Sequence, residues 1–377
     1  MVWGFPEISP IKALRSKLRR VFLLAYLSAR SEACARRRIP SRRRDAFLLG
    51  LAVLILASIY PRAVHAFDII PFNTRNQSPL VQIFGLPAAG NAVLAPRGQG
   101  EFHVMLDHAS NFVDEGTPTE QIVLDGETTR LTLGGRYGFT RNMEIGVEIP
   151  YVYHSGGFLD GFIINYHDLF GFPQGGRDQA PRNRLLYQYR RDGVDKLKVD
   201  SSGGGLGDIA LMAGLQLYND AAQYPRAVAL RASVKLPTGD SSSLYGSGST
   251  DVSLWITAAD AFELPIGRGA VFGAAGLMVM SNGNVLPDQQ VDHVGFGSIG
   301  AGWKPLSWIA FKVQMDAHTP FYRDSDLKSL SANAAQLLIG GTLGLSERTS
   351  LDIAVSEDIV TKTAPDVAFH FNVITRF

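Results

Sequence analysis

Cysteine is almost absent from this chain of 377 residues, since Cys34 is the single one. The part after residue 34 can therefore form neither disulfides nor thiolate metal sites. Enzyme motifs are also missing: there is no phosphate-binding glycine loop, no His-Glu-x-x-His and no Gly-x-Ser-x-Gly. His103 and His108 share one strand-like stretch, but an offset of five puts them on opposite faces. The sequence predicts no cofactor, no metal site and no catalytic residue.

Long apolar runs are absent after residue 66, so no membrane helix is expected there. A shorter run at 46–60 follows Arg42, Arg43 and Arg44 and precedes Val64-His65-Ala66. Basic, apolar and then small residues are typical of a secretory signal peptide. We expect residues 1–66 to be a basic segment plus signal peptide, cleaved after Ala66. The alternative is an uncleaved N-terminal anchor.

A surplus of positive charge is missing from the rest of the chain. Residues 1–66 hold 13 of the 36 Lys and Arg and 3 of the 35 Asp and Glu, which leaves 23 basic and 32 acidic residues, a net charge of about −9. Nucleic-acid binding needs clustered cations to neutralise phosphates. The sequence therefore excludes nucleic acid as an expected partner.

What the chain does have is alternation of apolar and polar residues, clearest at 143–153. Stretches of about 10 to 13 such residues are typical of tilted strands in a membrane barrel. We expect residues 99–377 to form an all-β, transmembrane, antiparallel up-and-down barrel of about 12 strands. The alternative is a soluble β-protein with one wet face. The expected strands lie near 101–112, 121–139 (with a bulge near Gly126), 143–153, 208–217, 228–236, 251–258, 268–280, 293–304, 309–316, 331–344, 349–358 and 366–377.

The lengths of the connections alternate along this series. Short ones are expected at 140–142, 219–225, 263–267, 304–306 and 345–348, and longer ones at 113–120, 154–205, 237–249, 281–292, 319–330 and 359–365. Short periplasmic turns and long external loops are typical of outer-membrane barrels. This indicates a location in the bacterial outer membrane after export through the periplasm, in contact with lipid and lipopolysaccharide.

The last strand ends on Phe377, and its apolar face includes Phe369 and Phe371. A C-terminal Phe at the end of such a face resembles the signal by which barrel precursors are recognised. We expect these three residues to direct the chain to the barrel assembly machinery.

The polar parity of the strands is expected to face the lumen. A hairpin closed at 140–142 would set Arg136 opposite Gly146, with Glu144 and Glu148 as diagonal neighbours. These charges could brace the wall through salt bridges or line an aqueous path. The lumen-lining candidates are Arg130, Arg136, Glu144, Glu148, Asp208, Arg231, Lys235, Asp251, Lys312 and Asp316.

Two other stretches bear on the lumen. Within the loop 154–205, Phe158, Phe162, Tyr166 and Phe170 recur at a helical period. The helix could lie on the barrel rim at the level of the headgroups, or fold into the lumen as a lid with these four as lid residues. Residues 67–98 have no sustained periodicity and are expected to be a periplasmic lead-in or an N-terminal plug.

The same long loop carries a family resemblance. The residues Ser155–Phe162, His167–Asp178 and Pro181–Leu185 (SGGFLDGF, HDLFGFPQGGRD and PRNRL) resemble a family of bacterial outer-membrane proteins known as a domain of unknown function. Gly205–Ile209, Leu236–Gly239 and Gly246–Gly248 with Asp251 are similar to barrels associated with phenol degradation. The first resemblance implies fold and location but no activity.

The function expected from these patterns is passage of small molecules, with apolar or aromatic cargo. Two alternatives stay open. One is a structural envelope barrel that transports nothing. The other is an outer-membrane lipid hydrolase built on His108 and Ser110, whose spacing of two residues along a strand is about 7 Å, too long for a direct hydrogen bond in most rotamers.

Overall fold

The computed structural model describes residues 67–171, 175–220, 225–359 and 363–377. The expected signal peptide and the cleavage point at Ala66 lie outside the described residues. Within these ranges, no helix has the length and apolar character that a membrane span requires.

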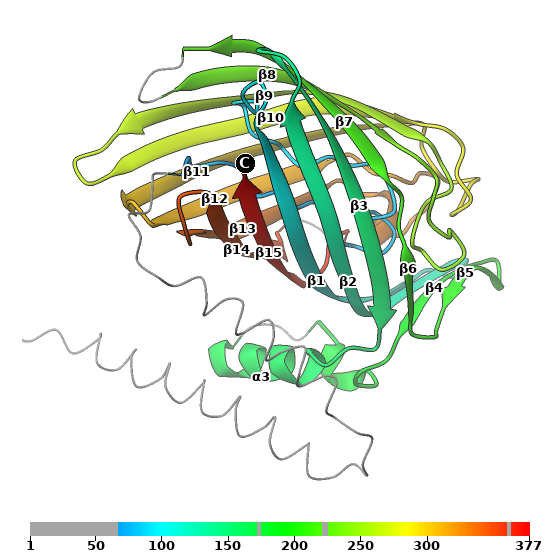
Figure 1. The fold of residues 1–377 in the computed structure, drawn as a ribbon. Coiled ribbons are helices and arrows are strands. Elements are labelled where there is room, and N and C mark those ends of the chain that lie inside the picture. Colours follow the sequence, from blue (N-terminus) through cyan, green and yellow to red (C-terminus); the bar gives the residue numbers. More distant parts are fainter. Residues whose placement is uncertain (1–66, 172–174, 221–224, 360–362) are drawn as a thin grey trace, which may run out of the picture. The chain divides into compact units, whose positions relative to one another are not determined.

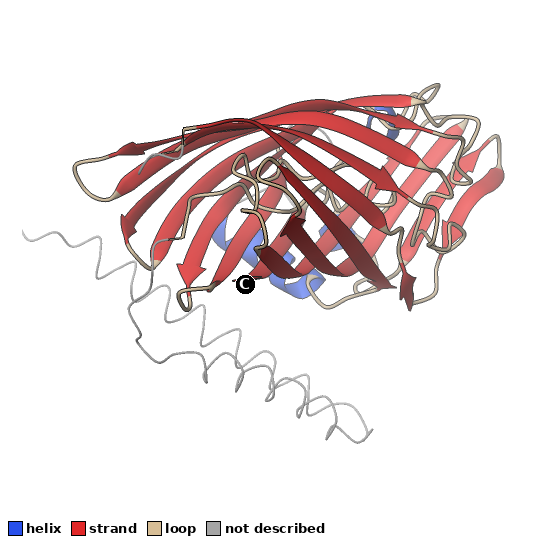
Figure 2. Cartoon of the chain, turned by 45° about the horizontal axis from the view of Figure 1, so that its top comes forward, coloured by secondary structure: helices blue, strands red, loops and turns tan. Residues whose placement is uncertain are grey.

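The described chain forms a closed antiparallel barrel with twelve positions in its wall (Figures 1 and 2). Closure is shown by β1, which pairs with β2 on one side and with the last strand, β15, on the other. The predicted fold and strand number are confirmed. The wall strands are β1 Gly100–Gly116, β2 Glu120–Gly138, β3 Met143–Ser155, β6 Gly203–Leu206 with β7 Ala210–Asn219, β8 Arg226–Lys235, β9 Asp251–Glu263, β10 Arg268–Met280, β11 His293–Leu306, β12 Ile309–His318, β13 Ala334–Gly344, β14 Thr349–Asp358 and β15 Val367–Arg376.

One wall position is divided between two strands, because β6 and β7 both pair with β3. The interruption at 207–209 is bridged by the amide of Gly207, which donates to the carbonyl of Pro150 at 2.8 Å. Asp208 therefore lies at a break in the wall rather than inside a continuous strand.

Alternation appears in the strands because one face of the wall is turned outward and the other inward. Outward residues such as Leu131, Leu133 and Tyr137 are 40–44% exposed, whereas inward Arg130, Thr132 and Arg136 are buried. A row of large apolar side chains without a protein cover is what lipid contact requires.

The bulge expected near Gly126 is wrong. The pairing of β1 with β2 runs through Asn111 and Gly126 without a shift in register. Gly126 instead marks a change of partner strand. Residues 120–125 of β2 pair with β4, and residues 127–138 pair with β3. Ile122 and Leu124 keep the inward parity, and the barrel interior is apolar at this level. Ile122 and Leu124 therefore lie on the same face of β2 as Arg130, and it is the polarity of the barrel interior that changes along the strand.

The connections segregate by length, as the sequence indicated. Those at 139–142, 264–267, 307–308 and 345–348 are short, and we call this the short-turn end; the opposite side is the long-loop end. The prediction of a long loop at 113–120 is wrong. Strands β1 and β2 extend to 17 and 19 residues and leave only 117–119 between them. The other elements belong to the long-loop end: helix α3 Asp160–Phe170, the 3-10 helix η1 Arg177–Gln179, the hairpin β4 Leu186–Arg191 and β5 Val194–Val199, and helix α4 Lys328–Ser331.

Residues 67–98, called the inner segment below, lie inside the ring of strands (Figure 2). The segment begins at the short-turn end, where the carbonyl of Phe67 accepts from Lys304 of β11. It returns to the same end, where Gly98 donates to the carbonyl of Gly138 at 2.9 Å. Its middle, Leu80 to Leu86, reaches the apolar core near the long-loop end.

Candidate functional site: the occupied lumen

The predicted lumen residues all have inward parity and converge on the inner segment. Nine of the ten are buried, and Asp316 is half-buried. Since polar and charged groups are buried only where they find partners, each of these side chains raises the question of what it bonds.

The ion pairs differ from those that the hairpin register suggested. Arg136 does pair in register with Gly146. Its guanidinium, however, lies 3.6 Å from Glu101 of β1, and Glu144 is held by Arg231 of β8 at 2.7 Å. Glu148 binds Arg75 of the inner segment at 2.6 Å. The charges connect strands across the lumen and to the segment, rather than forming a ladder within one hairpin.

Cationic side chains of the wall hold the backbone of the inner segment. Arg130 donates to the carbonyl of Gln82 at 3.2 Å, and Arg231 to that of Asn91 at 3.1 Å. Lys312 donates to the carbonyl of Ile70 at 3.0 Å and pairs with Asp352 at 3.1 Å. Hydrogen bonds from charged donors are stronger than neutral ones, so these contacts favour the segment's place inside the barrel.

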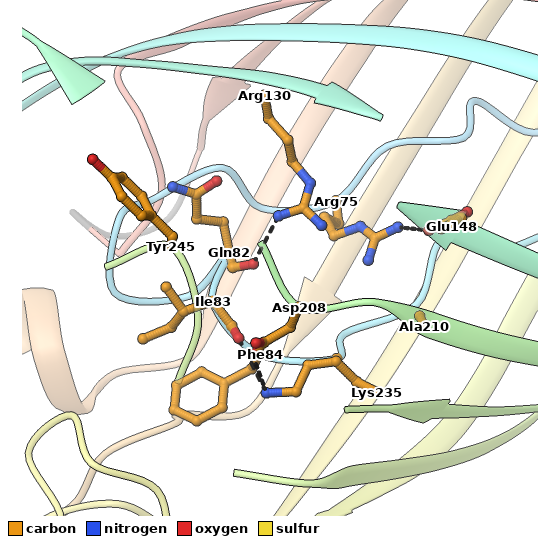
Figure 3. Close-up of a pocket in the computed structure, with 11 residues that line it drawn as sticks. Arg75, Gln82, Ile83, Phe84, Arg130, Glu148, Asp208, Ala210, Lys235 and Tyr245 are labelled. Atoms are coloured by element: carbon orange, nitrogen blue, oxygen red, sulfur yellow. Dashed lines mark hydrogen bonds and ion pairs between the residues drawn. The ribbon is translucent and has the colours of Figure 1, made fainter. Parts of the chain in front are cut away.

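Lys235 of β8 is the most heavily bonded of these cations (Figure 3). Its ammonium lies 2.7 Å from Asp208 and 3.0 Å from Asp251, and it also donates to the carbonyl of Ile83 at 3.3 Å. Asp251 accepts in turn from the amide of Gly85 at 2.7 Å, and Asp208 from the amide of Gly239 at 2.8 Å. One cation therefore links the wall, the break at 207–209, the loop after β8 and the inner segment.

An apolar core closes the lumen above this charged zone. Phe84 of the inner segment stacks on Phe321 with ring centroids 4.8 Å apart. Tyr322 donates to the carbonyl of Leu80 at 3.1 Å, and burial raises the pKa of its hydroxyl, which keeps it a donor. The wall and loop residues of this core are Val113, Ile122, Leu124, Leu185, Tyr187, Tyr189, Leu244, Met278, Met280, Val285, Leu286, Val294, Phe321, Tyr322, Leu327 and Leu330.

Little space is left between the segment and the wall. The cavity beside Lys235 and Arg130 has a volume of about 10 Å³, and the next one, beside Arg136 and Arg231, about 20 Å³. A single water needs roughly 10–15 Å³ by the same measure. Each of these two cavities has room for about one water, so the segment fills the described lumen closely beside these four cations.

The loop helix lies on the outer face of the wall, not in the lumen, so the lid placement is wrong. The amides of Phe158 and Leu159 donate to Glu127, whose parity on β2 is outward, and Phe158 stacks on the outward His108 at 5.4 Å. Phe158, Phe162 and Tyr166 are 72%, 47% and 39% exposed. The side chain of Phe170 lies outside the described part. The helix forms as expected, but its exposed face is directed away from the barrel.

The contacts of His108 and Ser110 on the outer face give no support to the lipid hydrolase that was the alternative function. His108 binds Thr129 at 2.8 Å and lies 3.1 Å from Glu127, whereas the hydroxyl of Ser110 is bonded by Arg177. A serine nucleophile needs a base within hydrogen-bond reach, and this pair lacks that contact. In the described ranges, no group of three or more His, Cys, Asp and Glu side chains could hold a metal ion.

The family model described as "Protein of unknown function (DUF3187)" matches residues 48–377. The chain belongs to this family. No curated protein matches the sequence.

Solved structures similar to this DUF3187 protein are outer-membrane barrels. The COG4313 outer membrane channel from Pseudomonas putida F1 has a TM-score of 0.50 and 12% identity, over 76% of this chain and 98% of that chain. The translocator domain of the autotransporter NalP from Neisseria meningitidis has a TM-score of 0.36 and 11% identity, over 74% and 88%. The toluene transporter TodX from Pseudomonas putida has a TM-score of 0.27 and 10% identity, over 83% and 99%. The likeness to the COG4313 channel, at 12% identity, shows the barrel fold.

Four charged residues of the DUF3187 site escaped the sequence analysis: Arg75, Glu101, Lys304 and Asp352. Lys304 lies within a shift in register between Trp303 and Leu306, which obscures its parity. Asp352 lies in a strand with weak alternation. Arg75 belongs to a segment without periodicity, so only its charge within an apolar, proline-containing stretch could have drawn attention to it.

Proposed function

We propose that this protein is an outer-membrane channel for small molecules and that the inner segment is its gate. The observation that carries the proposal is the way in which the segment is held. Wall cations bond its backbone carbonyls, and one Arg–Glu pair joins a segment side chain to the wall. Such contacts can be exchanged for water without unfolding any strand.

The cargo follows from what the segment occupies. Its apolar residues Leu80, Ile83 and Phe84 fill the core at the long-loop end, and its carbonyls meet cations below. A molecule that takes its place meets an apolar and aromatic mouth and then a charged passage. We infer a small amphipathic cargo with an apolar part and a polar, hydrogen-bond-accepting part. The exposed aromatic face of α3 gives no support to this choice, because it lies outside the lumen.

Orientation and assembly complete the proposal. The long-loop end faces the outside and the short-turn end the periplasm, after export with a signal peptide that ends at Ala66. Phe377, Phe369 and Phe371 serve recognition by the assembly machinery, and lipid with lipopolysaccharide surrounds the wall. Phe371 is 38% exposed on the outer face, and Phe377 closes the ring through two backbone hydrogen bonds with Gly100 of 2.9 and 3.1 Å.

The test is conductance of the purified protein in planar bilayers with the segment locked or free. A Cβ at Gly85 would lie 3.1 Å from that of Asp251. A disulfide needs about 3.8 Å between the two Cβ atoms, so Gly85→Cys with Asp251→Cys requires only a small shift. The oxidised variant should be silent and the same protein after reduction should show discrete channels. Equal silence in both states, in the unaltered protein and in a variant lacking residues 70–93 would favour a structural barrel.

A further inference from the structure

A third cavity lies on the side of the inner segment that faces β1 and β15. It is bounded by the two limbs of the segment, through Asn73 and Asn91, and by His103, Arg136 and Asn372 of the wall. Its volume is about 10 Å³, which is the room that one water needs.

Four buried polar atoms around this cavity have no hydrogen-bond partner. They are Oδ1 of Asn73, Nδ1 of His103, and both Oδ1 and Nδ2 of Asn372. The side chain of Asn372 is completely buried, and His103 is 3% exposed. Buried polar groups are nearly always bonded in folded proteins, so a cluster of unpaired atoms around one space indicates a bound molecule.

The chemistry of the cluster selects that molecule. The Nε2 of His103 lies 3.0 Å from Glu101, which leaves Nδ1 as an acceptor if Nε2 carries the proton. Asn73 and Asn372 add acceptors, and the amide nitrogen of Asn372 adds a donor. Glu101 and Arg136 bring opposite charges to the lining, so neither an anion nor a cation is favoured. Water donates twice and accepts twice, which fits this mixed set.

Toward β9, the segment is bonded directly to the wall at Ala89 and Gly90. There Trp255 donates to the carbonyl of Ala89 at 2.9 Å and Thr257 to that of Gly90 at 3.0 Å. Inward strand residues of the described chain with an unpartnered buried side-chain atom lie only on the adjacent strands β1, β14 and β15. They are His103, Asn111, Asp352, His370 and Asn372.

We propose that this cavity is a binding site for water, and that the seam between the inner segment and strands β1 and β15 is hydrated in the closed barrel. Water-soluble reagents then reach Asn372 along this seam more readily than Thr257 of β9, beside which the carbonyls of the segment are bonded directly to the wall. The inference concerns the resting protein and stands whether or not the barrel transports a solute.

Cysteine accessibility tests the inference. Asn372→Cys and Thr257→Cys are a matched pair, because both wall residues are 0% exposed and both face the segment. The purified full chain in detergent would be treated with a small charged methanethiosulfonate, with the unaltered protein as the background for Cys34. Modification at 372 should be at least tenfold faster than at 257. Equal rates, or a faster reaction at 257, would overturn the proposal.

A second pair protects the test against a misfolded variant. Asn73→Cys lies on the same cavity, and Ala89→Cys lies on the bonded limb of the segment. Position 73 should react faster than 89, and adding Asn372→Leu should slow the reaction at 73, because an apolar side chain removes the partners of the water. Unchanged labelling at 73 in that double variant would count against the site. The readout is the labelling rate and not conductance, so the test can support the hydrated seam even in a barrel that transports nothing.

Discussion

At the scale of single residues, Lys235 connects more parts of the protein than its one charge suggests. It lies between two carboxylates, Asp208 and Asp251, and contacts the hydroxyls of Ser247 and Ser249. Both carboxylates are buried, so loss of the cation would leave them without their shared counter-charge. Breaking such a pair costs about 3–5 kcal/mol, because a buried charge then lacks compensation.

We therefore expect Lys235→Met to loosen the inner segment. The unfolding temperature in detergent should fall, and solute influx into liposomes should rise. Lys198→Met is the control, since Lys198 is exposed and pairs with the exposed Asp200. A variant at 235 with unchanged unfolding temperature and influx would contradict the role given to this cation.

Phe377 is a second residue with a consequence for the whole ring. Its amide and carbonyl form the last hydrogen bonds between β15 and β1. We expect deletion of Phe377 to leave an exported, unassembled chain that proteases degrade. Phe158→Ala, at a residue that is 72% exposed, is the control. Normal amounts of a heat-modifiable barrel without Phe377 would refute the prediction.

At the scale of elements, α3 is an amphipathic helix fastened to the outside of the wall. Ile163 and Ile164 are buried against the protein. Arg177 at the start of η1 forms ion pairs with Asp160, the first residue of α3, at 2.5 Å and with Asp366 at 2.6 Å. The exposed Phe162 and its neighbours continue the apolar outer surface of the strands, which is the arrangement of a helix lying at the membrane interface.

A polarity-sensitive fluorophore can test the place of α3. Attached to Phe162→Cys in liposomes, it should emit at shorter wavelength than the same fluorophore at Val194→Cys and be quenched by spin-labelled lipid. Val194→Cys on the β5 hairpin is the matched control, since Val194 is 57% exposed and lies away from the helix. Equal, weak quenching at both sites would remove α3 from the membrane surface.

At the scale of the whole molecule, the two ends of the barrel are predicted to face opposite compartments. Arg141 lies in a short turn and Ser242 in a long loop, and both side chains are exposed. Single cysteines at these positions should label differently on intact cells: Ser242→Cys should react with an impermeant thiol reagent and Arg141→Cys should not. The reverse pattern would invert the orientation.

The wall could be predicted from sequence because each strand meets two solvents. Leu131 lies on the exposed outer face and Arg130 on the buried inner face, so their alternation reports the structure directly. The bulge predicted near Gly126 was wrong because Ile122 and Leu124 lie on the inner face at a level where the interior changes from polar to apolar. The lid predicted around Phe162 was wrong because periodicity identifies a helix without saying which face of the wall the helix covers.

The contents of the lumen were hardly predictable for a different reason. Residues 70, 82, 83 and 91 are held by their backbone carbonyls, which every sequence offers equally. The ion-pair partners of Glu144 and Glu148 lie on β8 and on the inner segment, far along the chain. Such choices depend on tertiary distance, which strand parity does not encode.

The path of the inner segment also determines how a filled ring can be made and emptied. Phe67 and Gly98 both lie at the short-turn end. The segment is therefore a loop that enters and leaves the ring at the same end, and it does not pass through the ring. Within residues 67–98, neither end of the segment crosses the ring when β15 meets β1, so this part of the chain needs no threading. The segment can be withdrawn as a folded-back loop through the end by which it came in, and the ring behind it stays closed.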